Sequence, residues 1–169
     1  MSAAYRLEAN AAQIAQSLRA DAAGDVWAGG QISPASYAPV VVSTRERGRH
    51  LAPRLWGVPP PPNARDPYVV PFVRNLDSPF WIGNLRHTQF RCLVPMTGFW
   101  QRGEWFTATD QPIFACAGLW RDSEIPSFAI ITSGEGQAMP LLLTPETYDI
   151  WLHADFKLAR KLVESVAPA

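Results

Sequence analysis

Alternating arginines are the clearest candidates for binding chemistry in this chain. Arg45, Arg47 and Arg49 occupy every second position between Thr44 and His50. In a hairpin these three side chains would share one face, and a guanidinium binds phosphate or carboxylate through paired hydrogen bonds. The spacing predicts an anion-binding face, and a solvated turn is the alternative interpretation.

Arginine also dominates the basic residues as a whole. Thirteen of the fifteen are Arg, and only Lys157 and Lys161 are Lys. This bias suits bidentate anion contacts, although a GC-rich genome would produce the same composition. Fifteen acidic residues balance the fifteen basic ones, so the formal net charge is zero. The chain therefore has no global electrostatic drive toward nucleic acid or anionic membranes.

Motifs for other chemistry are missing from the sequence. Cys92 and Cys116 are the two cysteines, and neither belongs to a closely spaced Cys/His set of the kind that binds zinc. Both lie in apolar runs, which predicts buried, reduced thiols. There is no Gly-x-Ser-x-Gly elbow, no phosphate-binding loop ending in Lys-Ser/Thr and no His-Glu-x-x-His. The sequence indicates no metal and no cofactor.

The chain also lacks the usual signals for membranes and export. No segment approaches the roughly 18 apolar residues of a membrane helix. The first residues have neither the basic start nor the apolar run of a signal peptide. We therefore expect a cytoplasmic protein without a membrane partner.

The elements that must position these side chains are short. A length of 169 residues fits one domain over 1–169. Asn10 and Gln13 form a capping pattern that starts a helix over 10–19, and Thr144-Pro145-Glu146 starts another. We expect loop over 20–39, mostly irregular chain over 63–90, and a last helix capped by Asp155.

Strands are predicted at Pro39–Val42, Arg54–Gly57, Arg91–Val94, Glu104–Thr107, Ile113–Cys116, Phe128–Thr132 and Leu141–Leu143. Many short strands with helices at both chain ends predict an α+β fold with a mostly antiparallel sheet.

Several short motifs resemble those of the SRAP family, whose domain processes abasic sites in DNA, and they follow one another along the chain in the same order as in the family. The most specific motif is Arg91-Cys92-Leu93-Val94-Pro95 followed by Phe99. The others, which span nearly the whole chain, are Met1-Ser2-Ala3-Ala4-Tyr5, Trp56-Gly57 with Pro59, Val73-Arg74-Asn75 with Ser78-Pro79 and Trp81, Ala117-Gly118-Leu119-Trp120, Phe128–Thr132, Ala138-Met139-Pro140 and Trp151-Leu152. The resemblance implies a single SRAP-like domain with a barrel-like sheet, flanking helices and a role in the DNA damage (SOS) response.

The resemblance also implies a particular chemistry. In the family, the initiator Met is removed and the α-amine of a cysteine attacks the aldehyde of an abasic site in single-stranded DNA. The thiol then closes a thiazolidine ring, which is a stable DNA–protein crosslink. An Asn and an Arg hold the nucleic acid or the terminal residue, while a Glu and a His move protons. An autoproteolytic activity that uses the same cysteine has also been proposed for the family.

This sequence departs from the family at nearly every catalytic position. Ser2 replaces the cysteine, Phe72 the Asn and Gln101 the Glu, whereas Arg74 is retained. No histidine lies in 133–138, where Glu135 could stand in as a base or be a solvated loop carboxylate. A misalignment by one or two residues is the alternative, in which case Glu104 would supply the acid, although Gly103 before it favours a turn. Joint loss of these groups predicts a pseudoenzyme.

Three functions remain as hypotheses. The first is a DNA-binding module that does not crosslink and holds single-stranded or abasic-site DNA. It would use the nucleic-acid-binding candidates Arg74, Arg45, Arg47, Arg49, Arg54, Trp56 and Phe72. The second is a regulatory pseudoenzyme whose old cleft binds a protein partner, and the zero net charge favours it slightly. The third is a residual Schiff-base lyase, in which the Ser2 α-amine, with a reference pKa of about 7.7–8.0, attacks the aldehyde and Glu135 acts as base.

Overall fold

The computed structural model describes residues 3–22, 27–44, 46, 48–64, 68–133 and 139–166. Its elements are β1 (Tyr5–Leu7), α1 (Ala11–Leu18), β2 (Gly30–Ile32), β3 (Tyr37–Ser43), β4 (Arg49–Trp56), β5 (Phe72–Val73), α2 (Ile82–Arg86), η1 (Thr88–Phe90), β6 (Arg91–Met96), β7 (Gly98–Gln101), β8 (Glu104–Phe106), β9 (Phe114–Arg121), β10 (Ser127–Ser133), β11 (Met139–Pro140), β12 (Leu142–Leu143), η2 (Pro145–Thr147), α3 (Tyr148–His153) and α4 (Phe156–Val166). The mixed helix and strand content confirms the predicted α+β class.

Five strands close into a barrel, which confirms the barrel-like sheet. Their order is β4-β3-β6-β9-β10, and β10 closes the ring by pairing with β4. The closing pair is parallel, whereas the other four pairs are antiparallel. Apolar runs such as Val40–Val42 fill the interior with buried side chains. Ring closure leaves no unpaired sheet edge among these five strands.

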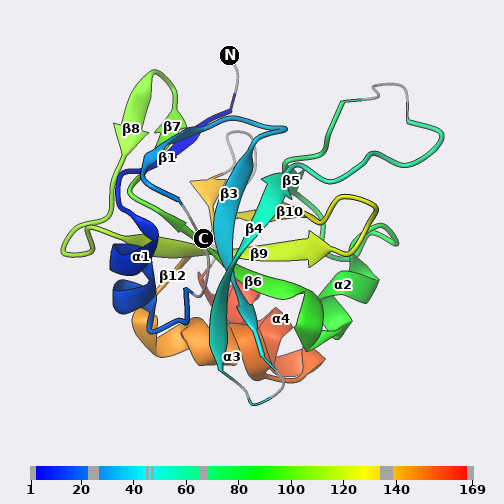
Figure 1. The fold of residues 1–169 in the computed structure, drawn as a ribbon. Helices are drawn as coiled ribbons and strands as arrows, with labels where there is room; N and C mark the ends of the chain where they lie inside the picture. Colours follow the sequence, from blue (N-terminus) through cyan, green and yellow to red (C-terminus); the bar gives the residue numbers. More distant parts are fainter. Residues whose placement is uncertain are drawn as a thin grey trace.

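A smaller antiparallel sheet carries the start of the chain. Its strand order is β2-β1-β7-β8, so β1 lies between two segments that are distant in sequence. Tyr5 is paired with Ile32 on one side and with Phe99 on the other. Figure 1 shows this sheet and the chain start above the barrel, while α3 and α4 lie below it. The barrel therefore has a chain-start end and a helix-covered end.

Local signals account for three of the helices. Asn10 accepts a hydrogen bond from the Gln13 backbone N–H, and the Gln13 side chain accepts one from Asn10, so the predicted capping box of α1 is confirmed. Thr144 precedes η2, which continues into α3 as expected. The Asp155 carboxylate accepts a hydrogen bond from the Leu158 N–H at the start of α4, which confirms the predicted cap.

Two expected loops contain regular structure. The segment 20–39 includes β2 and the first residues of β3, and the segment 63–90 includes β5, α2 and η1. Pro71 and Pro79 precede α2, so neither of them interrupts its hydrogen bonds. The short strands were missed because their partners are far away in sequence: β5, for example, is paired with β10.

The helix-covered end is held together by one buried arginine. Arg91 is 0% exposed. Its guanidinium donates hydrogen bonds to the carbonyl of Leu85 at 2.9 Å, of Trp151 at 3.1 Å and of Ala154 at 2.6 Å. These carbonyls lie at the C-terminal ends of α2 and α3, where the helix dipole favours a positive charge. Arg91 therefore connects β6 to two helices.

Candidate functional site

Four of the candidate residues lie outside the described ranges. These are Ser2, Arg45, Arg47 and Glu135. The Ser2 amine hypothesis and the three-arginine face therefore stay predictions for these positions. The structure places the remaining candidates, Arg49, Arg54, Trp56, Phe72, Arg74 and Gln101.

Four aromatic rings meet where the small sheet covers the barrel. The Trp56 ring lies 4.9 Å from Tyr5 and 5.8 Å from Phe72, and the Phe72 ring lies 6.2 Å from Phe99, all edge to face. Trp56 is 0% exposed, and its indole N–H donates to the Pro71 carbonyl. Trp56 is part of the core, so the expectation that it stacks on a base is wrong.

Phe72 packs near β1, and Arg74 lies over the Phe72 ring. Phe72 is half-buried, and its ring fills space next to Phe99, the register partner of Tyr5. Arg74 is exposed, and its guanidinium carbon lies 5.8 Å from the centroid of the Phe72 ring. An exposed guanidinium next to an aromatic face can reach a phosphate while the ring limits its motion. This arrangement keeps Arg74 available for binding at the chain-start end.

The β7–β8 hairpin places Gln101 near the chain-start end of the barrel. Arg102 (φ 53°) and Gly103 (φ 79°) form the two-residue turn, which confirms the turn expected at Gly103. Gln101 and Glu104 are register partners across it, so their side chains share one face. Both line a hollow of about 330 Å³ that also includes Met139. The alternative acid, Glu104, therefore lies next to Gln101.

Arg49 and Arg54 lie elsewhere on the barrel. Arg49 donates to the Leu18 carbonyl at 2.7 Å and forms a 2.9 Å salt bridge with Asp149 of α3, at the helix-covered end. Strands rise about 3.3 Å per residue, so β4 places Arg49 roughly 23 Å from Trp56. The Arg54 guanidinium carbon lies 4.3 Å from the centroid of the Trp120 ring, and burial lowers the pKa of Arg54. Neither Arg49 nor Arg54 joins the side chains around Arg74.

Both thiols of the chain are inside the barrel. Cys92 and Cys116 are free and 0% exposed, as predicted. Burial raises the pKa of each thiol well above its ordinary value. A thiol that is buried and protonated is a poor nucleophile. Neither cysteine can therefore replace a thiol at the chain start.

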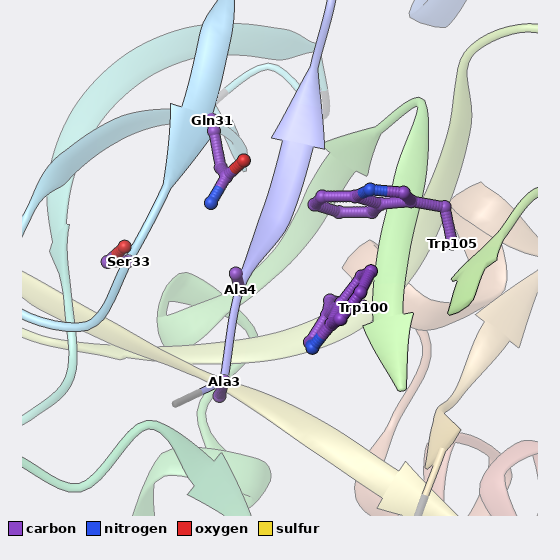
Figure 2. A pocket seen from close by; sticks show the side chains of 6 residues that line it. All are labelled: Ala3, Ala4, Gln31, Ser33, Trp100 and Trp105. Atoms are coloured by element: carbon purple, nitrogen blue, oxygen red, sulfur yellow. The ribbon is translucent and has the colours of Figure 1, made fainter. Parts of the chain in front are cut away.

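The outer face of the small sheet contains a second hollow, of about 350 Å³, which we call the tryptophan pocket. Its lining residues are Ala3, Ala4, Gln31, Ser33, Trp100 and Trp105. In Figure 2 the two indoles stand on one side, Gln31 and Ser33 on the other, and the two alanines of the chain start lie between them. The backbone N–H of Trp100 donates to the Ala4 carbonyl at 3.0 Å, which joins the strand that carries Trp100 to the chain start.

Arg6 borders this pocket, although no sequence motif indicated it as one of the site residues. Its guanidinium carbon lies 4.3 Å from the centroid of the Trp105 ring. The side chain reaches Trp105 by passing over Gly98, where a Cβ would lie only 3.0 Å from Arg6 Nε. Alternation along β1 places Ala4 and Arg6 on one face. That pattern could have indicated a shared surface, but the pairing of β1 with β7 was not apparent from the sequence.

Within residues 3–22, 27–44, 46, 48–64, 68–133 and 139–166, no group of three or more His, Cys, Asp or Glu side chains is arranged to hold a metal ion. No helix of the described chain is long and apolar enough to cross a membrane.

Comparison with protein families finds a model described as SOS response associated peptidase (SRAP), which matches residues 1–169. Comparison with curated proteins finds no match. Two similar crystal structures come from Bordetella bronchiseptica. One, a structural-genomics target, has a TM-score of 0.71 and 18% identity, covering 94% of this chain and 92% of that one. The other, a phage-related protein, has a TM-score of 0.73 and 17% identity, covering 99% and 90% respectively. These identities support the shared fold alone.

Proposed function

Because the chain belongs to the SRAP family, we propose that it binds single-stranded DNA at the chain-start end of its barrel without forming a covalent crosslink. The proposal rests on the burial of both thiols in the chain. The sequence contains only Cys92 and Cys116, and both are fully buried. No accessible thiol can close the thiazolidine ring that the family chemistry requires.

The surroundings of Phe72 support the loss of the reaction. A hydrogen-bonding amide is expected at this position from the family pattern, but the Phe72 ring packs against Trp56 and Phe99. A hydrocarbon ring cannot orient a polar aldehyde or its hydrate. Gln101, in place of an acid, has no titratable proton for general acid–base catalysis.

Retained binding is supported by Arg74. Its guanidinium is exposed beside Phe72, whose ring contacts Phe99, the register partner of Tyr5 in β1. Phosphate contacts by arginine give affinity without sequence preference. The module would therefore bind single strands weakly and without selecting a sequence.

Titration with salt tests this binding function. For about three phosphate contacts on a single strand, the slope of log K against log salt concentration should be near −2, from roughly −0.7 per contact. Arg74→Ala should weaken binding and bring the slope about 0.7 closer to zero. Fluorescence anisotropy with a labelled thymidine oligomer between low and moderate salt measures both quantities.

Arg86→Ala provides the matched control for this titration. Arg86 is an exposed arginine at the end of α2 and lies over Phe156 of α4, so it belongs to the helix-covered end. Its removal should leave the salt slope unchanged. Equal slopes for the native protein and Arg74→Ala, or no binding even at low salt, would count against the proposal.

A further inference from the structure

We propose that the tryptophan pocket receives one unpaired nucleobase of the bound strand, with Arg6 contacting the adjacent phosphate. The inference rests on the proposed binding of single-stranded DNA and adds a second place on the protein where the strand is held. The pocket lies on the outer face of the small sheet, whereas Phe72 packs against Phe99 on the opposite face of β7. A strand that passes the chain start could reach both faces.

The walls of the pocket suit an aromatic ring. Trp100 and Trp105 are register partners, and their ring centroids lie 5.2 Å apart with an interplanar angle of 63°. Both indoles are only half-buried, so part of each ring surface is open to solvent. Bases of single strands stack on such exposed aromatic side chains irrespective of sequence. The pocket volume of about 350 Å³ lies at the small end of the usual range for ligand pockets, as one base requires.

Small residues between the walls leave the space open. Ala4, which directly precedes β1, lies at the pocket floor, with Ser33 on one side and Trp100 on the other. A larger side chain than that of Ala4 would fill the gap between the indoles and β2. The floor is therefore formed by the backbone and the methyl groups of Ala3 and Ala4.

The wall opposite the indoles can bind the edge of a base. Gln31 and Ser33 are exposed side chains on or next to β2. Across the described ranges, no hydrogen bond occupies the Gln31 amide or the Ser33 hydroxyl. An amide and a hydroxyl each offer both a donor and an acceptor. Such a pair can accommodate the edges of different bases, which agrees with binding that lacks strong sequence preference.

Arg6 supplies the charge that a nucleotide needs. Its guanidinium lies against the Trp105 ring at 4.3 Å, and the absence of a side chain at Gly98 gives it this path. In the part of the chain that the structure describes, no carboxylate or carbonyl accepts a hydrogen bond from this guanidinium. Stacking leaves the N–H groups at the edge of the guanidinium plane available for phosphate oxygens. The combination of stacked arginine and indole walls favours a nucleotide over an uncharged aromatic ligand.

Two oligomers of equal length separate base contacts from phosphate contacts. One is a ten-residue thymidine oligomer, and the other carries a tetrahydrofuran residue in place of every nucleoside, so that it has phosphates and no bases. The native protein should bind the thymidine oligomer more tightly. Trp105→Ala should weaken binding of the thymidine oligomer about tenfold and leave the base-free oligomer within about twofold. Arg74→Ala should weaken both oligomers alike.

Three further variants control for effects of the substitutions on folding. Trp105→Phe keeps an aromatic ring and should preserve the preference for bases, whereas Gln31→Ala should reduce it. Phe106→Ala removes an exposed aromatic from the other face of the same strand and should leave the preference unchanged. The pocket assignment is overturned if Trp105→Ala affects both oligomers equally or neither. Failure of the native protein to bind either oligomer would instead overturn the proposed function itself.

Discussion

Incubation with a single-stranded oligonucleotide that carries one abasic site is expected to leave no heat-stable protein–DNA band on a denaturing gel. A stable ring needs a thiol next to the attacking amine, whereas Ser2 offers a hydroxyl. The oxazolidine that a hydroxyl could form hydrolyses far more readily than a thiazolidine. Cys92 and Cys116 cannot compensate, since both are buried.

Restoring the nucleophile alone should recover little of the crosslink. The variant Ser2→Cys regains the thiol, but Phe72 still packs between Trp56 and Phe99, and Gln101 still lacks an acidic proton. Positioning supplies much of the rate of such reactions, so a well-placed thiol is insufficient without its partners. Ser2→Ala is the matched control for the native protein. A heat-stable band that the native protein forms and Ser2→Ala does not would refute the prediction.

The largest expected effect on stability comes from Arg91→Met. The substitution removes the guanidinium but leaves the carbonyls of Leu85, Trp151 and Ala154 in the interior without their donor. Unsatisfied buried acceptors are costly, and loss of one partner from a buried charged network lowers the free energy of unfolding by about 3–5 kcal/mol. Total stabilities are only about 5–15 kcal/mol, so the variant should be close to unfolding.

Burial also shifts the pKa of Arg91, but the guanidinium keeps its positive charge. It lowers the pKa of the guanidinium to about 10, an effect that the charge of Asp155 partly opposes. The group is therefore protonated at neutral pH and donates charged hydrogen bonds, which are stronger than neutral ones. Arg91→Lys keeps a charge but cannot span three carbonyls with one planar fork, so its stability should lie between those of the native protein and Arg91→Met.

Urea denaturation followed by tryptophan fluorescence measures this difference. The midpoint should fall while the slope with denaturant stays the same, because the surface exposed on unfolding is similar. Arg86→Met is the control, as it removes an exposed arginine from the same region, and surface changes usually stay within about 0.5 kcal/mol. An Arg91→Met protein within about 1 kcal/mol of the native one would contradict the assigned role.

These expectations separate two uses of arginine in one chain. At the helix-covered end, Arg91 and Arg49 bond to backbone carbonyls and to Asp149, so their charge stabilises the fold. At the chain-start end, Arg74 and Arg6 lie against aromatic rings. The arginine-rich composition therefore has a structural component in addition to any role in binding phosphate.

Features that depend on neighbouring residues could be predicted from the sequence alone. The cap of α1 by Asn10 and Gln13 needs only residues within one helical turn, and the same applies to the cap of α4 by Asp155. Buried thiols were predictable because Cys92 and Cys116 lie inside apolar runs. The barrel-like sheet was predictable from the series of SRAP-like motifs, because their order and spacing reflect a shared fold.

The tertiary structure alone decided which side chains meet. The sequence predicts that Trp56 is available for stacking, because its sequence neighbours give no sign of Tyr5 and Phe72. These two residues lie 51 and 16 positions away and pack against its ring. β1 and β7 are short strands whose pairing joins residues more than ninety positions apart, and that pairing creates the tryptophan pocket beside Arg6. Long-range pairing depends on the closing of large chain loops and on the packing of the whole core, neither of which leaves a signal in a three-residue segment.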